Sequence, residues 1–364
     1  MLSRRSFALS GVAALAAACK KKRSPGFDGY VYVANEAGNA IAVVDLTAFA
    51  VARHIRIDDS PTAVIADPDE PRVYAFAPAS GTIYEVDTET FAVARRVKVG
   101  QSISMRLSDR SLWVLGRRTL TEVPLESFRA SATLQLAADA HDFDLSNYTR
   151  LAAVSYGGNG AVSVIDLKSR SVGAPVKVSD GVGVARFRTD GKGLMVADTA
   201  GRQLCVMDAS ARIIANLPLA VRPDNLCFNG DGGQLFITGE GRDAVVVVFP
   251  YYVPQVAETV LAGHAPAAMA ASATHLFLAN PQAGDVTILD ITRRRIVAVT
   301  AVGADPGYIT VTPDNNYALV LNRQSGDMAV IRTIGIVADR RKSAALFTMI
   351  PVGSRPVSAA VKAV

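Results

Sequence analysis

Side chains that commonly act as metal ligands or nucleophiles are scarce in this chain, with only four histidines and three cysteines among 364 residues. They are scattered, whereas a structural zinc site needs Cys and His at short, regular spacings. The sequence contains no Gly-x-Ser-x-Gly elbow, His-Glu-x-x-His motif, haem-attachment motif, phosphate loop or dinucleotide fingerprint. We therefore predict no catalytic residue, no metal site and no cofactor. Catalytic sites can also be assembled from distant loops, so the missing motifs do not exclude an enzymatic activity.

Five polar residues stand out because each lies just before a strand-like segment, at places where the repeats of the chain differ from one another. They are His141, Arg222, His264, Asp305 and Arg355. In the ring architecture argued below, such connections converge on one mouth of a central channel. We predict a polar rim there that holds an anionic ligand or a cofactor. The alternative is a solvated funnel whose charges pair with each other.

Cys19 is the one cysteine with a distinctive context. Arg4 and Arg5 precede an apolar stretch at 8–18 that is too short to span a bilayer, as in a cleaved export signal. Ser-Arg-Arg-Ser-Phe resembles a twin-arginine signal, and Leu-Ala-Ala-Ala-Cys resembles a bacterial lipobox with Ala in place of its usual Leu. We predict a signal peptide at 1–18 and a tether at 19–27 that is lipidated at Cys19. The alternative is an ordinary cleaved signal.

The net charge of +5 comes mainly from this leader and tether. Residues 1–23 hold six basic residues and no acid, which leaves 32 basic against 33 acidic residues in the rest of the chain. A nearly neutral remainder gives no reason to expect nucleic-acid binding.

The elements that must position the five polar residues come from a repeat of about forty residues. Each copy reads as an apolar strand, a strand ending in Asp and an outer strand, preceded by an inner strand that closes with a turn. Eight second strands are recognisable, spaced 39 to 43 residues apart, and they begin near Tyr30, Val73, Leu112, Leu151, Leu194, Leu235, Leu276 and Tyr317. Four short strands at this period are the signature of β-propeller blades.

The first copy lacks its inner strand, and the segment from Arg355 to Val361 matches the opening of a repeat. We therefore predict an all-β fold at 28–364, a single propeller of eight four-stranded blades closed by its last strand, which leaves no open sheet edge. Seven blades is the alternative, because the third copy is degenerate and has Pro124 where Asp ends other copies.

These repeats resemble the YVTN-type β-propeller family. The resemblance rests on Tyr-Val-Ala-Asn at 32–35, on the Ile-Asp and Leu-Asp strand endings at 165–166 and 289–290, and on Pro-Asp at 68–69 and 313–314. Departures at Pro124, Phe249 and Arg332 put the regularity of three blades in question. Propellers similar to this include surface-layer and lipoprotein repeats, lactone hydrolases, amine dehydrogenase subunits and haem d1 domains, so the resemblance implies a fold and no single activity.

The repeated Asp at the end of the third strand is predicted to cap the following turn, which makes it structural. Cys205 and Cys227 lie in predicted strands and are interpreted as two buried thiols, with a disulfide as the alternative. The loop at 249–254, Phe-Pro-Tyr-Tyr-Val-Pro, is expected to pack on its own blade, with a partner contact as the alternative. Basic runs at 293–295 and 340–342 share one face and suggest either a solvated surface or a contact with anionic lipid or polysaccharide.

The sequence thus predicts an exported, membrane-anchored lipoprotein of the periplasm or cell surface, monomeric, that acts as a cell-envelope binding or protein-interaction scaffold. Its partner would be an envelope protein, a polysaccharide or a small ligand. The alternative is a propeller enzyme, either similar to the lactone hydrolases or a redox protein with a cofactor at the channel mouth.

Overall fold

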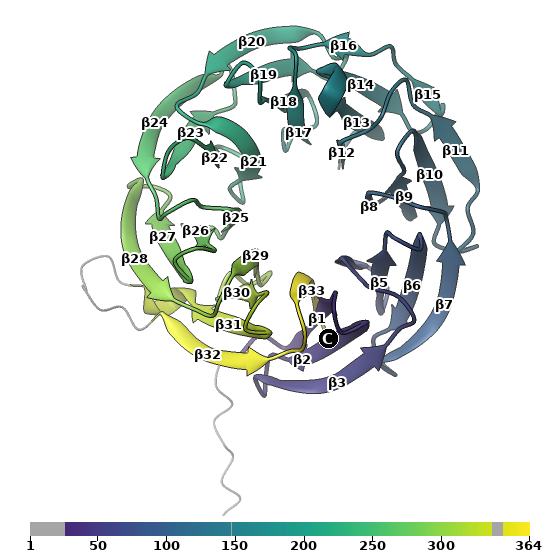
Figure 1. Cartoon of the computed structure of the whole chain (residues 1–364), viewed down its shortest axis with the longest axis vertical. Coiled ribbons are helices and arrows are strands. Elements are labelled where there is room, and N and C mark those ends of the chain that lie inside the picture. Colours follow the sequence, from purple (N-terminus) through teal and green to yellow (C-terminus); the bar gives the residue numbers. More distant parts are fainter. Residues whose placement is uncertain (1–25, 147, 337–344) are drawn as a thin grey trace, which may run out of the picture.

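The computed structural model describes residues 26–146, 148–336 and 345–364. The predicted signal peptide, Cys19, most of the tether and the basic run at 340–342 lie outside these residues. In the described part, eight antiparallel sheets stand side by side around an open centre (Figure 1). No helix within the described ranges is long and apolar enough to cross a membrane.

Each sheet is one blade of a β-propeller, with its strands stacked outward from the centre. The innermost strands of blades 1 to 8 are β33 (Pro356–Ala363), β4 (Ala63–Ala66), β8 (Ser104–Ser108), β12 (Asp142–Leu145), β17 (Val182–Phe187), β21 (Arg222–Phe228), β25 (Ala268–Ala271) and β29 (Pro306–Val311). The second strands are β1 (Gly29–Asn35), β5 (Arg72–Ala77), β9 (Ser111–Leu115), β13 (Leu151–Tyr156), β18 (Gly193–Asp198), β22 (Leu235–Glu240), β26 (His275–Asn280) and β30 (Tyr317–Asn322).

The third strands are β2 (Ala40–Asp45), β6 (Thr82–Asp87), β10 (Thr119–Pro124), β14 (Ala161–Asp166), β19 (Gln203–Asp208), β23 (Ala244–Phe249), β27 (Asp285–Asp290) and β31 (Asp327–Arg332). The outer strands are β3 (Ala50–Arg56), β7 (Ala92–Lys98), β11 (Ala132–Gln135), the pair β15 (Ser171–Val172) and β16 (Val176–Lys177), β20 (Ile213–Pro218), β24 (Gln255–Leu261), β28 (Arg295–Ala301) and β32 (Leu346–Pro351). Two short 3-10 turns are η1 (Gly157–Asn159) and η2 (Thr333–Gly335). The strands that end at Pro124, Phe249 and Arg332 occupy regular places in their blades.

The ring closes as predicted, because β33 pairs with β1 along the register Gly29 with Ala363 to Ala34 with Ser358. The chain's last strand therefore completes its first blade, and the eight-blade prediction is confirmed over the seven-blade alternative. The third copy is a complete blade in spite of its degenerate sequence.

The core lies between neighbouring blades. Second and third strands are buried on both faces, as in Val245–Val248, where every residue is fully buried. A sheet covered on both sides needs continuous apolar runs, which is why these strands do not alternate. Burial of their side chains supplies the main stabilisation of the ring.

Turn aspartates and the two described cysteines are structural. Asp166 Oδ1 accepts from Lys168 N at 2.8 Å and Ser169 N at 2.9 Å, and its counterparts in other blades make similar bonds. Cys205 packs in the core between blades 4 and 5, whereas Cys227 packs between blades 6 and 7, and both thiols are free. Burial raises the pKa of each thiol to about 11, so both are poor nucleophiles.

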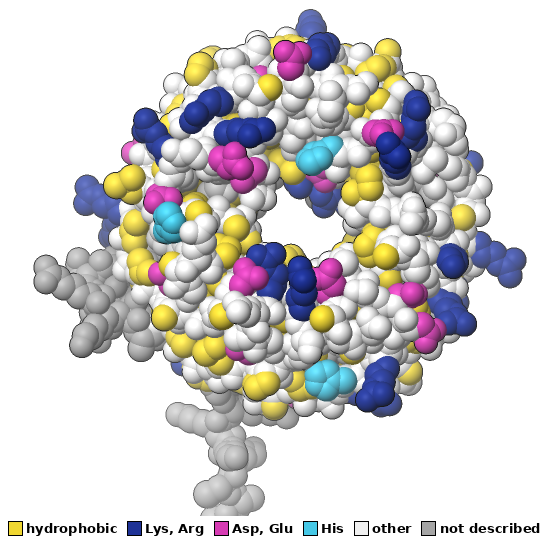
Figure 2. Space-filling model, viewed as in Figure 1, with side chains coloured by type: hydrophobic (Ala, Val, Ile, Leu, Met, Phe, Trp, Pro, Cys, Tyr) yellow, Lys and Arg dark blue, Asp and Glu magenta, His cyan; other side chains and the backbone are white. Residues whose placement is uncertain are grey.

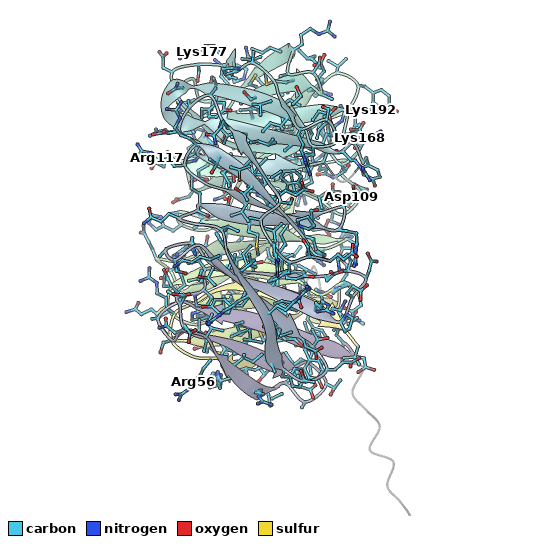
Figure 3. The ribbon with its side chains drawn as sticks, turned by 90° about the vertical axis from the view of Figure 1, so that its right-hand side faces the viewer. Arg56, Asp109, Arg117, Lys168, Lys177 and Lys192 are labelled. Carbon is cyan, nitrogen blue, oxygen red and sulfur yellow. The ribbon has the colours of Figure 1, made fainter. Side chains whose placement is uncertain are left out.

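The ring has two distinct faces. The front face, toward the viewer in Figures 1 and 2, carries the connections between blades and those from second to third strand. The back face carries the connections from first to second and from third to fourth strand. Figure 3 shows the division from the side, with Arg56 and Arg117 at the front edge and Asp109, Lys168 and Lys192 at the back edge.

Candidate functional site

The five polar residues predicted for the channel mouth all lie on the front face, and four of them pair locally. Each of the four has one partner at the end of a second strand or in the connection that follows it. The pairs are Arg222 Nη1 with Glu240 Oε2 at 3.3 Å, His264 Nδ1 with Asp243 Oδ2 at 3.0 Å, Asp305 Oδ1 with Arg323 Nη2 at 2.7 Å, and Arg355 Nε with Glu36 Oε2 at 2.7 Å. Figure 2 shows oppositely charged side chains next to each other around the opening.

The fifth residue, His141, is exposed, and its backbone N donates to Ser155 O at 2.8 Å. Its imidazole makes no ion pair within the described part of the chain. The bond to Asp243 raises the pKa of His264 above its ordinary value. The structure therefore distributes these five residues as separate local contacts and does not gather them into one cluster. Their role in holding a ligand stays a prediction.

A tighter group of charges lies deeper, on the innermost strands of three consecutive blades. Arg106 comes from β8, Asp142 and Asp144 from β12, and Arg186 from β17. Arg186 Nη1 donates to Asp142 Oδ2, and Asp144 Oδ2 accepts from Phe187 N at 2.9 Å. These four side chains tie blades 3, 4 and 5 together along the channel wall.

Arg106 is held much more loosely than Arg186. Its Nε donates to the backbone oxygen of Phe143 at 2.7 Å. The nearest carboxylate oxygens are Oδ1 of Asp142, which is 3.8 Å from Nη2, and Oδ1 of Asp144, which is 3.6 Å from Nε. Among the described residues, its two Nη atoms have no hydrogen-bond acceptor. A guanidinium fixed at Nε and open at its two ends is arranged to bind a carboxylate or phosphate through two parallel bonds.

Burial shapes the charge of this group. Desolvation raises the pKa of the Asp144 carboxyl above its ordinary value, although the two arginines and the Phe187 N–H act in the opposite direction. For Arg186, burial alone would lower the pKa, but the two aspartates outweigh burial and hold its pKa above the ordinary value. Arg186 therefore stays charged.

The group opens into a cavity of about 620 Å³. That volume is within the range of small-molecule sites, which is about 300 to 1,000 Å³. Polar lining comes from Arg106, Asp144, Arg186, Arg188 and Thr189, and the apolar lining includes Met105, Leu145, Phe187, Leu226, Phe228 and Tyr308. The cavity is suited to a ligand with one anionic end and an apolar body.

A separate hollow on the back face, of about 800 Å³, lies between blades 2 and 3. At its base the fully buried carboxylate of Glu85 accepts from Arg72 and from Arg95, whose Nε is 2.9 Å away. Arg95 also donates to Leu125 O at 2.9 Å and lies over the ring of Phe128. Each guanidinium nitrogen of Arg95 makes a hydrogen bond, to Glu85 in its own blade and to the backbone oxygens of Leu125 and Glu126 in blade 3, so we interpret this group as structural.

Sequence reasoning missed the group around Arg106 because it searched the connections between strands. A signal was present inside the inner strands. The corresponding strands are wholly apolar in two other copies, Ala63–Ala66 and Ala268–Ala271, whereas β8, β12 and β17 are three consecutive inner strands that all carry charges. No group of three or more His, Cys, Asp or Glu residues in the described part of the chain is arranged to hold a metal ion.

No protein-family model and no curated protein matches the chain. Among solved structures, dihydro-heme d1 dehydrogenase NirN in complex with DHE is similar with a TM-score of 0.75 and 14% identity, over 91% of this chain and 75% of that one. Apo AztD from Citrobacter koseri has a TM-score of 0.70 and 12% identity, over 92% and 98%. Hydrazine synthase from Kuenenia stuttgartiensis has a TM-score of 0.59 and 20% identity, over 78% and 98%. At these identities the likeness establishes that the chain has the β-propeller fold.

Proposed function

We propose that this chain is an exported lipoprotein of the cell envelope whose propeller, of the YVTN repeat type, binds a small anionic molecule in its central channel. The export and anchoring part is supported by the leader and by the lipobox-like run before Cys19. We favour binding without catalysis, because Arg186, Asp142 and Asp144 of the channel group are already engaged in ion pairs and hydrogen bonds.

The observation that carries the ligand proposal is the open guanidinium of Arg106. Its Nη atoms have no acceptor among the described residues, and they line the cavity beside Phe187 and Phe228. An anion that bonded both Nη atoms would replace water without displacing an existing partner. The aromatic walls would then take up an apolar body, which adds favourable burial.

Three simple probes separate these two contributions. Benzoate carries both an anionic end and a ring, acetate carries the anion alone, and benzyl alcohol carries the ring alone. Thermal unfolding of the purified protein should shift upward most with benzoate. The shift should be lost in Arg106→Ala and kept in Arg117→Ala, which removes the same charge from an exposed front-face pair with Asp139. Equal shifts in both variants would contradict the proposal.

The anchor is tested by detergent-phase partitioning of the full chain produced in a bacterial host. Wild type should enter the detergent phase because several acyl chains on one residue give lasting membrane attachment. Cys19→Ser should remain in the aqueous phase. Aqueous partitioning of both proteins would end the lipidation proposal.

An enzyme remains the alternative function, with a cofactor at the channel mouth or a lactone-hydrolase-like reaction. Its support is the fold likeness to a protein named as a dehydrogenase. The absorption spectrum and metal content of the protein purified from its native compartment discriminate the two. A chromophore or a stoichiometric metal would favour the enzyme.

A further inference from the structure

The back face of the ring carries most of the strongly exposed apolar side chains. Among the residues that the structure describes, six large apolar side chains are at least 75% exposed: Tyr148, Tyr252, Val253, Leu261, Ile334 and Val364. All except Leu261 lie on the back face. Isolated exposed apolar residues are ordinary, so their placement on one face carries an argument only together with a second observation about that face.

These apolar tips come from well-separated blades. Tyr148 is in the first connection of blade 4, Tyr252 and Val253 are in the third connection of blade 6, and Ile334 is in η2 of blade 8. They therefore lie around the ring and do not form one pocket. A broad surface is the kind of partner that contacts all of them at once.

The loop that carries Tyr252 is fixed at its base. Tyr251 OH is 2.7 Å from Thr189 Oγ1, and Arg188 Nη1 donates to Pro250 O at 3.2 Å while its guanidinium covers the Tyr251 ring. The loop thus packs on blade 5, so the prediction that it packs on its own blade is wrong. The Tyr252 side chain at the tip of this loop is fully exposed.

The tether leaves from this same face. A side chain at Gly26, where the described chain begins, would lie 3.0 Å from Leu46 O, in the third connection of blade 1. Cys19 is seven residues before Gly26. Seven residues span at most about 25 Å when fully extended. A lipid on Cys19 therefore keeps the back face close to the bilayer.

Charge on the back face does not oppose this contact. Lys168 and Lys192 lie at its edge (Figure 3), Arg293 lies in the third connection of blade 7, and Arg295 begins the following strand β28. Acidic side chains of this face are engaged locally: Asp166 caps its own turn, and Asp109 pairs with Arg150 at 2.6 Å. Both signs are interspersed, which permits approach to a lipid headgroup layer.

From these two independent observations we infer that the back face lies on the membrane surface, with Tyr148, Tyr252, Val253 and Ile334 in the headgroup region and the front mouth of the channel directed away from the bilayer. This rests on the proposed lipid anchor. Tyrosine is favoured at membrane interfaces because its ring is apolar and its hydroxyl is polar.

Site-specific fluorescence tests the orientation on the lipidated full chain, reconstituted in phosphatidylethanolamine and phosphatidylglycerol vesicles that contain a headgroup nitroxide lipid. A thiol-reactive fluorophore is placed with Ile334→Cys or Tyr252→Cys on the back face, and with Ser354→Cys on the front face as the matched control. Cys205 and Cys227 contribute little labelling, because their thiols have pKa values of about 11.

Quenching should be severalfold stronger at positions 334 and 252 than at position 354. A protein that does not float with the vesicles would overturn the anchor and the orientation together. A protein that floats but is quenched equally at all three positions, or more at 354, would overturn the orientation alone. If the fluorophores at positions 252 and 334 were shielded by an added envelope protein and not by the vesicles, the orientation would also be overturned, because the back face would then contact a protein.

Discussion

Removing one channel arginine at a time should separate ligand binding from stability. Arg106→Ala removes a loose contact to two carboxylates at 3.6 and 3.8 Å and one hydrogen bond to Phe143 O. A partly exposed ion pair contributes about 0 to 1 kcal/mol, and one hydrogen bond about 1 kcal/mol. We therefore expect the free energy of unfolding to fall by less than about 2 kcal/mol, following those two contributions.

Arg186→Ala should lower the free energy of unfolding by more than Arg106→Ala does, because Arg186 donates directly to Asp142 and both side chains are largely buried. Its removal leaves Asp142 and Asp144 facing each other without their main counter-charge. Losing one partner of a buried ion pair costs about 3 to 5 kcal/mol, and the remaining exposure of this pair places it at the lower end, about 3 kcal/mol.

Urea denaturation followed by tyrosine fluorescence or circular dichroism measures both variants. The midpoint should fall clearly for Arg186→Ala and slightly for Arg106→Ala, with an unchanged dependence on urea. Benzoate affinity should fall in Arg106→Ala by roughly ten- to a hundredfold, as for lost charged hydrogen bonds. Equal destabilisation by the two substitutions would refute the view that Arg106 is held loosely and kept for a ligand.

Three further substitutions test other parts of the structure. Glu85→Ala should lower the free energy of unfolding by about 3 kcal/mol, because it leaves the guanidiniums of blade 2 without their buried carboxylate; a loss under 1 kcal/mol in urea denaturation would contradict this. Gly263→Ala should cost about 1 to 3 kcal/mol through overpacking, since its Cβ would lie 2.0 Å from Nδ2 of buried Asn280; unchanged thermal unfolding would argue against that packing. Asp224 is exposed at the surface, but its partial desolvation, together with the nearby charge of Glu240, raises its pKa to about 6, above its ordinary value of 3.8. Folding therefore disfavours the ionised carboxylate of Asp224. The resulting loss in the free energy of unfolding is absent below pH 3.8 and grows as the pH rises to about 6. Asp224→Asn should therefore stabilise the protein at pH 7.5 and have little effect near pH 4, and the same gain at both values would refute the assignment.

The fold was accessible from sequence because propeller blades are strongly periodic. Apolar second strands repeat at nearly constant spacing in eight copies, and Asp ends five of the eight third strands, so the repeat predicts eight blades with seven as the alternative. The matching segment after Arg355 predicted the closure. Even the degenerate third copy kept the apolar Leu112–Leu115 strand, and burial of that strand was enough to preserve the blade.

The candidate site was less accessible because it depends on which side chains meet across blades. Sequence position placed Arg222 and His264 on the front face, but it did not give their partners, Glu240 at the end of β22 and Asp243 in the turn that follows it. Arg106 lies in an inner strand. Whether its Nη atoms are free to bind a ligand depends on their distances to Asp142 and Asp144, which the spacing of residues in the sequence does not give. The base of the loop at 249–254 is likewise set by contacts with the neighbouring blade.

The central claim is that Arg106 holds a natural anionic ligand in the channel. It is tested most directly by purifying the protein from cells that produce it natively, denaturing it, and identifying the released small molecules by mass spectrometry. We predict a carboxylate or phosphate with an apolar body, near one per protein chain, from wild type and Arg117→Ala and absent from Arg106→Ala. The same small molecules from all three proteins, or none from wild type, would contradict the claim.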